Sequence, residues 1–190
     1  MTRFLATTGI NQRGYTLVEL LVSIGVLTIL GAVAIPGMDN ILKNNRRVTI
    51  TNEFISSLQV ARSEAATRNQ RVTVCASANG SNCSGASYWK NGWIVFNDAD
   101  LNGSPGGDDE LIIKYVQGDG KVDVLPGDFS GAITYRPNGR AMAETIADNS
   151  GTFTFCDDRG AKFARALIIG SNGRPQLSDH MADGSEPDCE

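Results

Sequence analysis

The feature of this sequence that most constrains its fold is a long apolar run close to the N-terminus. Residues 15–35 contain one charged side chain, Glu19, and are followed by Pro36. As an α-helix this run would be about 31 Å long, which matches the hydrocarbon core of a bilayer. The residues before it carry Arg3 and Arg13 and no acid, so they are expected to stay in the cytoplasm. The run therefore predicts a single-pass anchor, with the rest of the chain on the far side of the inner membrane.

Three interpretations of this run compete. A plain transmembrane anchor explains its length but gives no role to Glu19. A secretory signal cleaved at Ala32-Val33-Ala34 would need an apolar region longer than the usual 7–15 residues, and that region would still contain the carboxylate. The third interpretation makes Glu19 functional, because a carboxylate in a membrane costs roughly 2.5–3.5 kcal/mol and usually has a partner. Since the run contains no Lys or Arg, this interpretation places the partner on another chain.

The residues around Glu19 resemble the processing signal of type IV prepilins. Residues 13–21 read Arg-Gly-Tyr-Thr-Leu-Val-Glu-Leu-Leu. In that family a dedicated peptidase cuts after the glycine and methylates the new terminus, which implies cleavage between Gly14 and Tyr15 and N-methylation of Tyr15. The family's acid, four residues beyond the new terminus, corresponds to Glu19 and would neutralise the terminal ammonium of a neighbouring subunit. Pro36 lies where pilins commonly have a helix-kinking proline.

Beyond Pro36 the chain becomes polar but keeps a helical pattern. No Gly or Pro occurs between Met38 and Asn79, and apolar residues recur at helical spacing, which predicts one helix from about residue 16 to 68. The segment 59–65 resembles a segment of the GspH/FimT/FimU group of minor pilins and pseudopilins. The stripe expected to face the core contains Ile41, Val48, Ile55, Leu58, Ala61 and Ala65.

From Gln70 onward the pattern changes to short strands. Seven segments rich in Val, Ile, Phe or Tyr are separated by turns that contain Gly, Asn, Asp or Pro. They are residues 71–77, 93–97, 111–117, 121–125, 132–136, 152–156 and 165–169. One helix followed by closely spaced strands predicts an α+β fold in which the helix packs on an antiparallel sheet. Further segments that resemble the group, in order, are residues 92–96, 135–140, 155–157 and 170–174.

These patterns divide the chain into four parts. Residues 1–14 are the predicted leader peptide, and residues 15–36 are the transmembrane and assembly helix. Residues 37–69 form the amphipathic half of that helix. Residues 70–190 form a β-rich periplasmic head that ends in a tail. The resemblance to the group spans nearly the whole chain and implies the pilin fold.

The four cysteines favour disulfide bonds over a metal site. Cys75, Cys83, Cys156 and Cys189 are widely and irregularly spaced and contain no C-x-x-C. Three pairings are possible. The favoured one joins Cys75 to Cys83 across a short loop and Cys156 to Cys189, which tethers the tail. Loop closure assigns the second bridge about 3 kcal/mol or somewhat more.

One segment resembles half of a calcium-binding loop. Asp98, Asp100 and Asn102, followed by a glycine, match the first half of an EF-hand loop, and Asp109 falls at its twelfth position. The second half departs from that pattern, because residues 104–107 offer few ligands and Asp109 is shorter than the usual Glu. A solvated turn between two strands is the alternative. Calcium is therefore a secondary expectation, and no cofactor is predicted.

Charge disfavours nucleic-acid binding. The residues after Gly14 carry 15 basic and 21 acidic side chains, and a domain with this balance repels phosphate backbones. Residues 173–176 resemble a Gly-Arg-x-Arg element of a DNA-uptake branch of the group. Here Gln176 replaces the second arginine, which leaves Arg174 as a weak phosphate contact.

The sequence predicts no enzyme. His180 is the only histidine, and no G-x-S-x-G, P-loop or H-E-x-x-H occurs. The aromatic residues Tyr88, Trp89 and Trp93 favour core packing or a partner interface over a ligand platform.

The resemblance implies a minor pilin that helps to initiate a type IV pilus. Its expected partners are other minor pilins, the major pilin, the prepilin peptidase and the inner membrane, and its final location is the pilus at the cell surface. A minor pseudopilin of type II secretion and a DNA-binding minor pilin of natural transformation are the alternatives. The three differ in their partners rather than in fold.

Overall fold

The computed structural model describes residues 14–116, 120–142 and 149–189 of the 190-residue chain. The predicted leader peptide thus lies outside the described residues, except for Gly14. The chain forms two compact parts, one that ends at Leu42 and one from Lys43 to Glu190. Each part is described here by itself.

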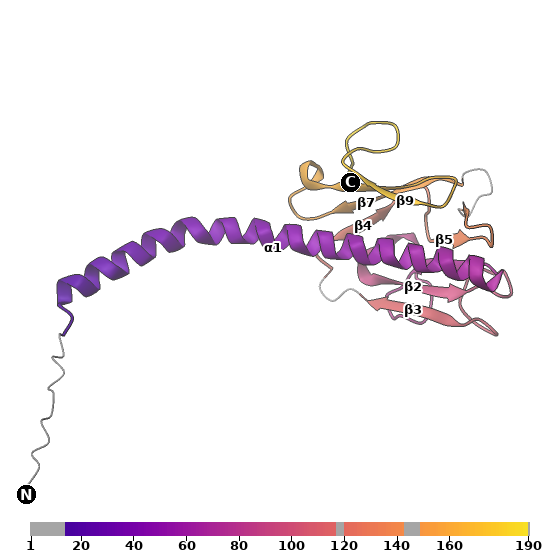
Figure 1. Cartoon of the computed structure of the whole chain (residues 1–190), viewed down its shortest axis with the longest axis horizontal. Helices are drawn as coiled ribbons and strands as arrows, with labels where there is room; N and C mark the ends of the chain where they lie inside the picture. The colour runs from indigo at the N-terminus through magenta and orange to yellow at the C-terminus, as the bar shows by residue number, and fades with distance from the viewer. Residues whose placement is uncertain (1–13, 117–119, 143–148, 190) are drawn as a thin grey trace, which may run out of the picture. The chain divides into compact units, whose positions relative to one another are not determined.

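The N-terminal part is dominated by the first half of helix α1 (Leu17–Arg68), which is continuous over 52 residues (Figure 1). This confirms the predicted single helix from about residue 16 to 68. Apolar side chains between Leu17 and Leu30 are more than half exposed, and the apolar window of α1 has none of its residues buried inside the protein. By length and composition α1 can cross a membrane. An exposed apolar surface of this size needs lipid or other helices to cover it.

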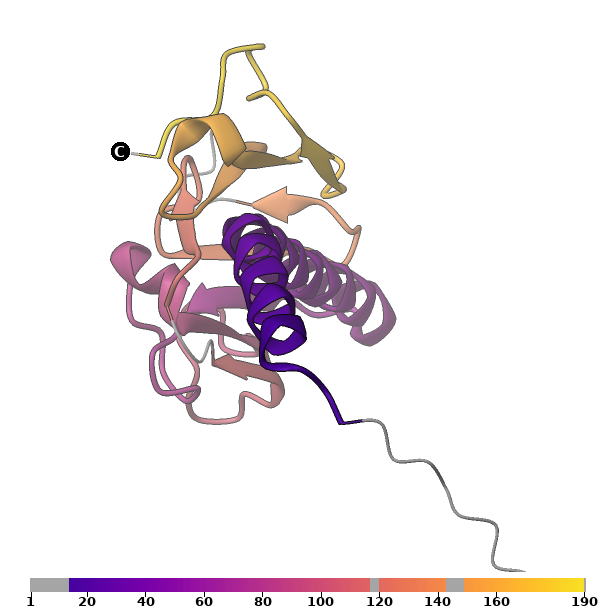
Figure 2. The same cartoon turned by 90° about the vertical axis from the view of Figure 1, so that its left-hand side faces the viewer.

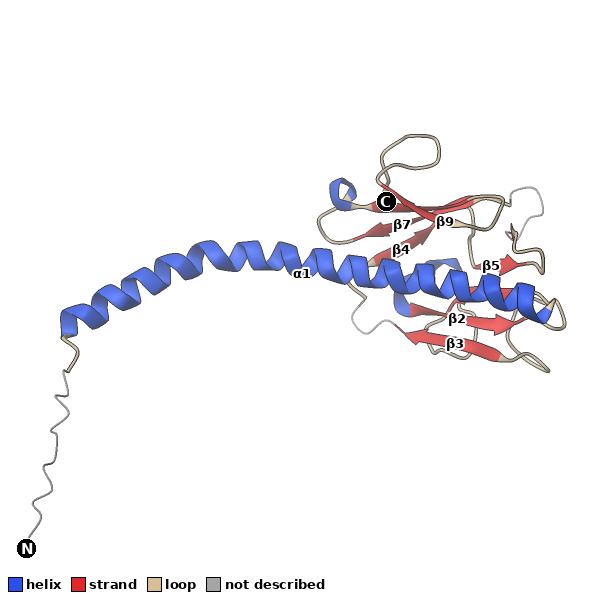
Figure 3. Cartoon of the chain, in the orientation of Figure 1, coloured by secondary structure: helices blue, strands red, loops and turns tan. Residues whose placement is uncertain are grey.

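The second part contains two antiparallel sheets on the second half of α1 (Figure 3). The first sheet has the order β3-β2-β1-β5-β6, and the second has the order β4-β7-β8-β9. The strands are β1 (Val72–Ala76), β2 (Gly92–Asn97), β3 (Leu111–Val116), β4 (Asp123–Pro126), β5 (Ala132–Tyr135), β6 (Ala141–Met142), β7 (Gly151–Cys156), β8 (Arg165–Ile169) and β9 (Pro175–Ser178). Two short 3-10 helices, η1 (Ala86–Asn91) and η2 (Ala161–Phe163), lie in the connections.

All seven predicted strands are present within one or two residues of their expected bounds, which confirms the antiparallel α+β fold, and they are divided between two sheets. β1 pairs with β2 and β5, whereas β7 pairs with β4 and β8. β1 and β5, and likewise β4 and β7, are separated by other strands in the chain, so local periodicity cannot assign these pairs. Strands β6 and β9 were not predicted. β6 has two residues, and β9 is an edge strand that starts with proline and is largely exposed.

One core joins α1 to both sheets. The second half of the helix lies where the two sheets meet (Figure 2). Phe54 is fully buried at the centre, with its ring centroid 4.8–5.8 Å from those of Trp89, Trp93, Phe153 and Phe155, all at edge-to-face angles. The Trp93 indole donates to Ser57 Oγ and the Trp89 indole to the Ser130 carbonyl, both at 2.8 Å. Both tryptophans are therefore core residues rather than a ligand platform.

The helical stripe that faces the core differs from the predicted one. The buried apolar positions of α1 are Ile50, Phe54, Leu58, Ala61 and Ala65. Ile41 and Val48 are 55% and 53% exposed, so their assignment to the core was wrong. They repeat with Ile55 every seven residues, and a straight helix drifts by about 20° over each such interval. The spacing of four and three residues that starts at Ile50 follows the face of a straight helix more closely.

Both favoured disulfides are present, Cys75–Cys83 and Cys156–Cys189, with Cα atoms 5.6 and 5.9 Å apart. Cys75 and Cys83 pack with Ile94 and Phe96 in a small cluster separate from the main core. This cluster explains why β1 and β2 are buried along their whole length. The second bridge joins the end of β7 to the tail.

Replacing Cys156 and Cys189 together by serine is expected to lower the free energy of unfolding by about 3 kcal/mol. The bridge closes a loop with a sequence separation of 33, and without it the unfolded state gains the entropy of that loop. Urea denaturation of a fragment spanning residues 43–190 measures the change. Ser185→Ala, at an exposed site in the same tail, should change stability by less than about 0.5 kcal/mol. A loss no larger than that of this control would contradict the tether's role.

Candidate functional site

The start of α1 is held by a reciprocal cap that involves Glu19. Thr16 is the residue before the helix, and its Oγ1 accepts a hydrogen bond from the Glu19 N–H at 3.2 Å. The Glu19 carboxylate in turn accepts from the Thr16 N–H at 3.4 Å. This Ser/Thr-x-x-Glu arrangement is a capping box, which satisfies two of the helix's free N–H groups. Thr16 thus supplies Glu19 with a partner from its own chain.

The cap changes how Glu19 must be interpreted. Its carboxylate lies in the first turn of α1, where the helix dipole favours negative charge. The absence of Lys and Arg from the apolar run therefore does not force its partner onto another chain, in contrast to the third interpretation of that run. The intersubunit role of Glu19 stays a prediction, and the capping role has to be separated from it by experiment.

The predicted cleavage site directly precedes this cap. Gly14 and Tyr15 lie outside the helix, and the Tyr15 side chain is 89% exposed. A Cβ placed on Gly14 would meet no atom within 4 Å. The bond between these two residues thus lies outside the helix, and cleavage there would place the new N-terminal ammonium one residue before Thr16.

The calcium-like loop brings its carboxylates together. Ligand oxygens of Asp98, Asp100 and Asp109 lie within 4.8 Å of one another. Most of these groups also hold the loop itself: Asp98 Oδ1 accepts from the Gly103 N–H at 3.2 Å, and Asp109 accepts from the N–H groups of Ala99 and Gly106 at 2.8 and 3.2 Å. Asn102 accepts from the Ser104 N–H at 2.7 Å. These hydrogen bonds give the residues a structural role in holding the loop, and calcium binding stays an untested prediction.

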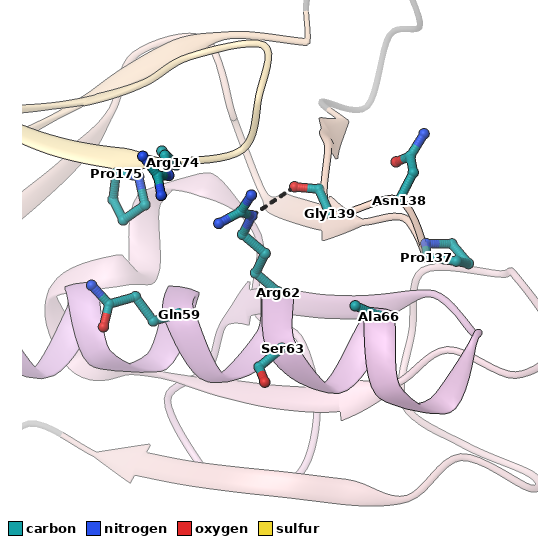
Figure 4. A pocket seen from close by; sticks show the side chains of 9 residues that line it. All are labelled: Gln59, Arg62, Ser63, Ala66, Pro137, Asn138, Gly139, Arg174 and Pro175. Carbon is teal, nitrogen blue, oxygen red and sulfur yellow. Dashed lines mark hydrogen bonds between the residues drawn. The ribbon is translucent and has the colours of Figure 1, made fainter.

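A polar groove lies beside the C-terminal part of α1. It encloses about 700 Å³ and is lined by helix residues and by two turns, one from each sheet (Figure 4). The lining residues are Gln59, Arg62, Ser63, Ala66, Pro137, Asn138, Gly139, Arg174 and Pro175. Arg174, the one residue in the sequence considered for phosphate contact, is exposed on the rim of this groove. Arg62 joins it from the helix, and no feature of the sequence had pointed to a role for Arg62.

Two glycines fix the shape of the groove. Gly139 and Gly173 both have a φ of +73°, and a Cβ on Gly173 would lie 2.2 Å from the Gly139 carbonyl oxygen. Only glycine allows the two turns to approach so closely. The Arg62 Nε donates to the Gly139 carbonyl at 2.9 Å, which holds its side chain between helix and turn. Beneath them Tyr135 is fully buried, and burial raises the pKa of its phenol.

A buried charged cluster joins α1 to the segment after β7. The Asp157 carboxylate accepts from Arg159 Nε at 2.9 Å and from Arg159 Nη2 at 2.6 Å, with Arg47 Nη1 3.7 Å away. The hydrogen bonds from Arg159 hold the pKa of Asp157 below its usual range. Arg159 also donates to Asn44 Oδ1 at 2.9 Å and lies over the Phe163 ring. Asp157 lies in the segment 155–157 that resembles the group, and these contacts give it a structural role.

Two family profiles match this chain, one over the head and one over the N-terminal segment. The profile of the family described as type II transport protein GspH matches residues 51–173, which is most of the head and the helix beneath it. A prokaryotic N-terminal methylation motif matches residues 10–35. Comparison with curated proteins finds no match.

Two crystal structures of the type IV minor pilin FimU from Pseudomonas aeruginosa share the fold. In one space group the match covers 75% of this chain and 98% of the FimU chain, with a TM-score of 0.50. In the other it covers 78% and 98%, with a TM-score of 0.52. Sequence identity is 20% in both. At this identity the match shows a shared fold.

Proposed function

The chain belongs to the family of type II transport protein GspH, and from this premise we propose that it is a minor pilin that is built into a type IV pilus and helps to initiate it. It is a structural subunit that performs no catalysis and needs no resident cofactor. The observation that carries the proposal is the combination of a methylation motif, an exposed apolar helix and Glu19 at the first helical turn. Before assembly the apolar half of α1 spans the inner membrane, and the head lies in the periplasm.

Association of apolar helices supplies the physical basis of assembly. Lipid-facing side chains gain packing contacts when neighbouring helices cover them. The charge on Glu19 then sets how a new subunit is placed among those helices. After cleavage at Gly14, the Tyr15 ammonium of a neighbouring subunit is the cation that Glu19 would meet. A carboxylate and an ammonium in an apolar environment attract strongly because water does not screen them. This pairing would place each new subunit at a fixed height along the filament.

Glu19→Ala is expected to be processed normally but to lose at least tenfold in its content in sheared filaments. The expected loss corresponds to about 1.4 kcal/mol or more of assembly free energy, which is modest for an ion pair in an apolar environment. The amount of the protein in the filament fraction, relative to that in the membrane fraction, is the measurement.

Two further variants separate charge pairing from capping. Glu19→Gln keeps an oxygen that can accept the Thr16 N–H but removes the charge, whereas Thr16→Ala removes the cap and keeps the charge. We expect Glu19→Gln to be lost from filaments like Glu19→Ala. Thr16→Ala should cost the helix about 1 kcal/mol and leave incorporation near the wild-type level. The reverse pattern would assign Glu19 to helix capping alone.

A minor pseudopilin of type II secretion is the second candidate, and the family description favours it. The Cys156–Cys189 tether resembles the pilus-associated branch more closely, which is why the pilus is preferred. Co-purification of the full chain from detergent-solubilised membranes distinguishes the two. Recovery with pilus subunits supports the proposal, and recovery with secretion-system subunits alone would replace it by the second candidate.

A DNA receptor is the weakest of the three functions. A gel shift with the full chain in detergent at low salt tests it, because a phosphate contact built on few arginines gives weak binding that falls steeply with salt. Clear retention of DNA would favour that function over a purely structural role.

A further inference from the structure

The groove beside α1 combines two arginine side chains with no acid in its lining. Arg62 comes from the helix and Arg174 from the turn before β9, and both side chains border the same space (Figure 4). Gln59, Ser63 and Asn138 add amide and hydroxyl groups. Within the described residues neither Arg62 nor Arg174 forms an ion pair, although six other arginine and lysine side chains of α1 and the head pair with acids there. Those six are Lys43, Arg47, Arg68, Lys90, Arg159 and Arg165.

Several guanidinium groups form no ion pair among the described residues, including those of Arg71, Arg136 and Arg140. Arg62 and Arg174 differ from these because both border one groove that has no carboxylate in its lining. Arg62 is held by its Nε bond to the Gly139 carbonyl, and this leaves its two terminal nitrogens as donors in a fixed direction. The turn that carries Arg174 is fixed by the bond from the Arg174 N–H to Asn172 Oδ1 at 2.9 Å.

The backbone around these arginines is also held in place. Gly173 packs against the Gly139 carbonyl so closely that any side chain there would clash with backbone, and Arg140 Nε donates to the Ser171 carbonyl at 3.2 Å. Turns from two different sheets are thus joined at one point. Such a junction fixes the backbone that carries Arg174 beside the held Arg62 side chain, and a preorganised site loses less entropy when it binds.

We propose that this groove binds an acidic segment of a different, neighbouring pilin subunit, with an Asp or Glu carboxylate between Arg62 and Arg174. The inference rests on the proposed function, because it takes a filament of pilin subunits as given. A guanidinium matches a carboxylate in planar geometry and in charge. The groove lies at the end of the head away from Lys43, about 29 Å along α1 from that residue. A contact in the groove would therefore use a different surface of this chain from the apolar half of α1.

The charge pattern favours a carboxylate over a phosphate backbone. Two arginines can neutralise about two phosphates, whereas strong nucleic-acid binding uses roughly 6–10 such contacts, and the acidic head opposes a polyanion. Two carboxylates in the acidic tail of a second copy are poorer occupants, because each already has a partner within its own chain. Asp179 pairs with Arg165 at 3.0 Å, and Asp183 accepts from Ser185.

Photo-crosslinking in filament-producing cells tests the proposal with the full chain. The probe is p-benzoylphenylalanine in place of Ser63, an exposed residue in the groove, and the matched control carries it in place of Asn52, an exposed residue of α1 outside the groove. We expect the Ser63 probe to crosslink a different pilin subunit within a few residues of an Asp or Glu. Arg174→Gln should reduce that yield about fivefold, the effect typical of a partly exposed ion pair. Lys162→Gln, which removes an exposed charge outside the groove, should leave the yield unchanged.

Charge exchange completes the test. Arg174→Glu should abolish the crosslink, and replacing the identified partner acid by arginine should restore it. Adducts confined to a second copy of this chain, to DNA or to peptides without an acid would overturn the proposal. So would equal yields from the Ser63 and Asn52 probes while the chain is present in filaments. Absence of the wild-type chain from filaments would instead overturn the proposed function, and the groove's role with it.

Discussion

Gly14→Ala is expected to leave the chain as an uncleaved precursor in cells that contain the prepilin peptidase. The methylation motif covers residues 10–35, and the resemblance places the cut between Gly14 and Tyr15. Alanine at position 14 would touch no other atom within 4 Å, so the folded protein tolerates it. A failure to cleave would thus report on recognition by the peptidase. Intact mass and N-terminal sequencing of the purified protein measure the outcome.

Gly25→Ala is the matched control for this experiment. It makes the same change inside the apolar run, at a glycine where an added methyl group would also meet no atom within 4 Å. This variant should be cleaved normally, with a mature chain that begins at Tyr15 and carries one N-methyl group on that residue. Normal trimming of Gly14→Ala would contradict the assigned site. A mature terminus at Ile35 in the wild-type protein would point to a secretory signal instead.

Local patterns in the sequence determine much of this fold. The single helix to residue 68 follows from the absence of Gly and Pro after Met38 and from helical spacing, and the strand segments follow from short β-branched and aromatic runs between turn residues. The division into two sheets could not be derived in this way. It depends on which strands pair across long stretches of chain, such as β1 with β5, and packing rather than local propensity decides those pairs.

The candidate site, too, could be predicted only in part from local sequence patterns. Glu19 is conspicuous because a carboxylate is costly in an apolar run, but its capping box was missed although Thr16 stands three residues before it. That signal was available from sequence. The groove was not, because the Arg62 side chain bonds to a carbonyl 77 residues away. The contact between Gly139 and Gly173 likewise joins turns from two sheets, and the sequence shows only two ordinary turn glycines.

Phe54→Ala is expected to lower the free energy of unfolding of the head by about 4 kcal/mol. Phe54 is fully buried and contacts four aromatic rings from η1, β2 and β7. Its loss leaves a cavity at the point where α1 meets both sheets, and edge-to-face ring contacts are lost in addition to apolar burial. Domains of this size have a total stability of about 5–15 kcal/mol, so the variant would retain only part of it.

Urea denaturation of the fragment spanning residues 43–190, followed by far-ultraviolet circular dichroism, measures this change. Val48→Ala is the matched control, because Val48 lies on the same helix but is 53% exposed, and it should cost less than about 0.5 kcal/mol. A similar small loss for Phe54→Ala would mean that α1 does not form one core with the two sheets. A loss near 4 kcal/mol, with the control unchanged, would establish Phe54 as the residue that fixes the helix to the head.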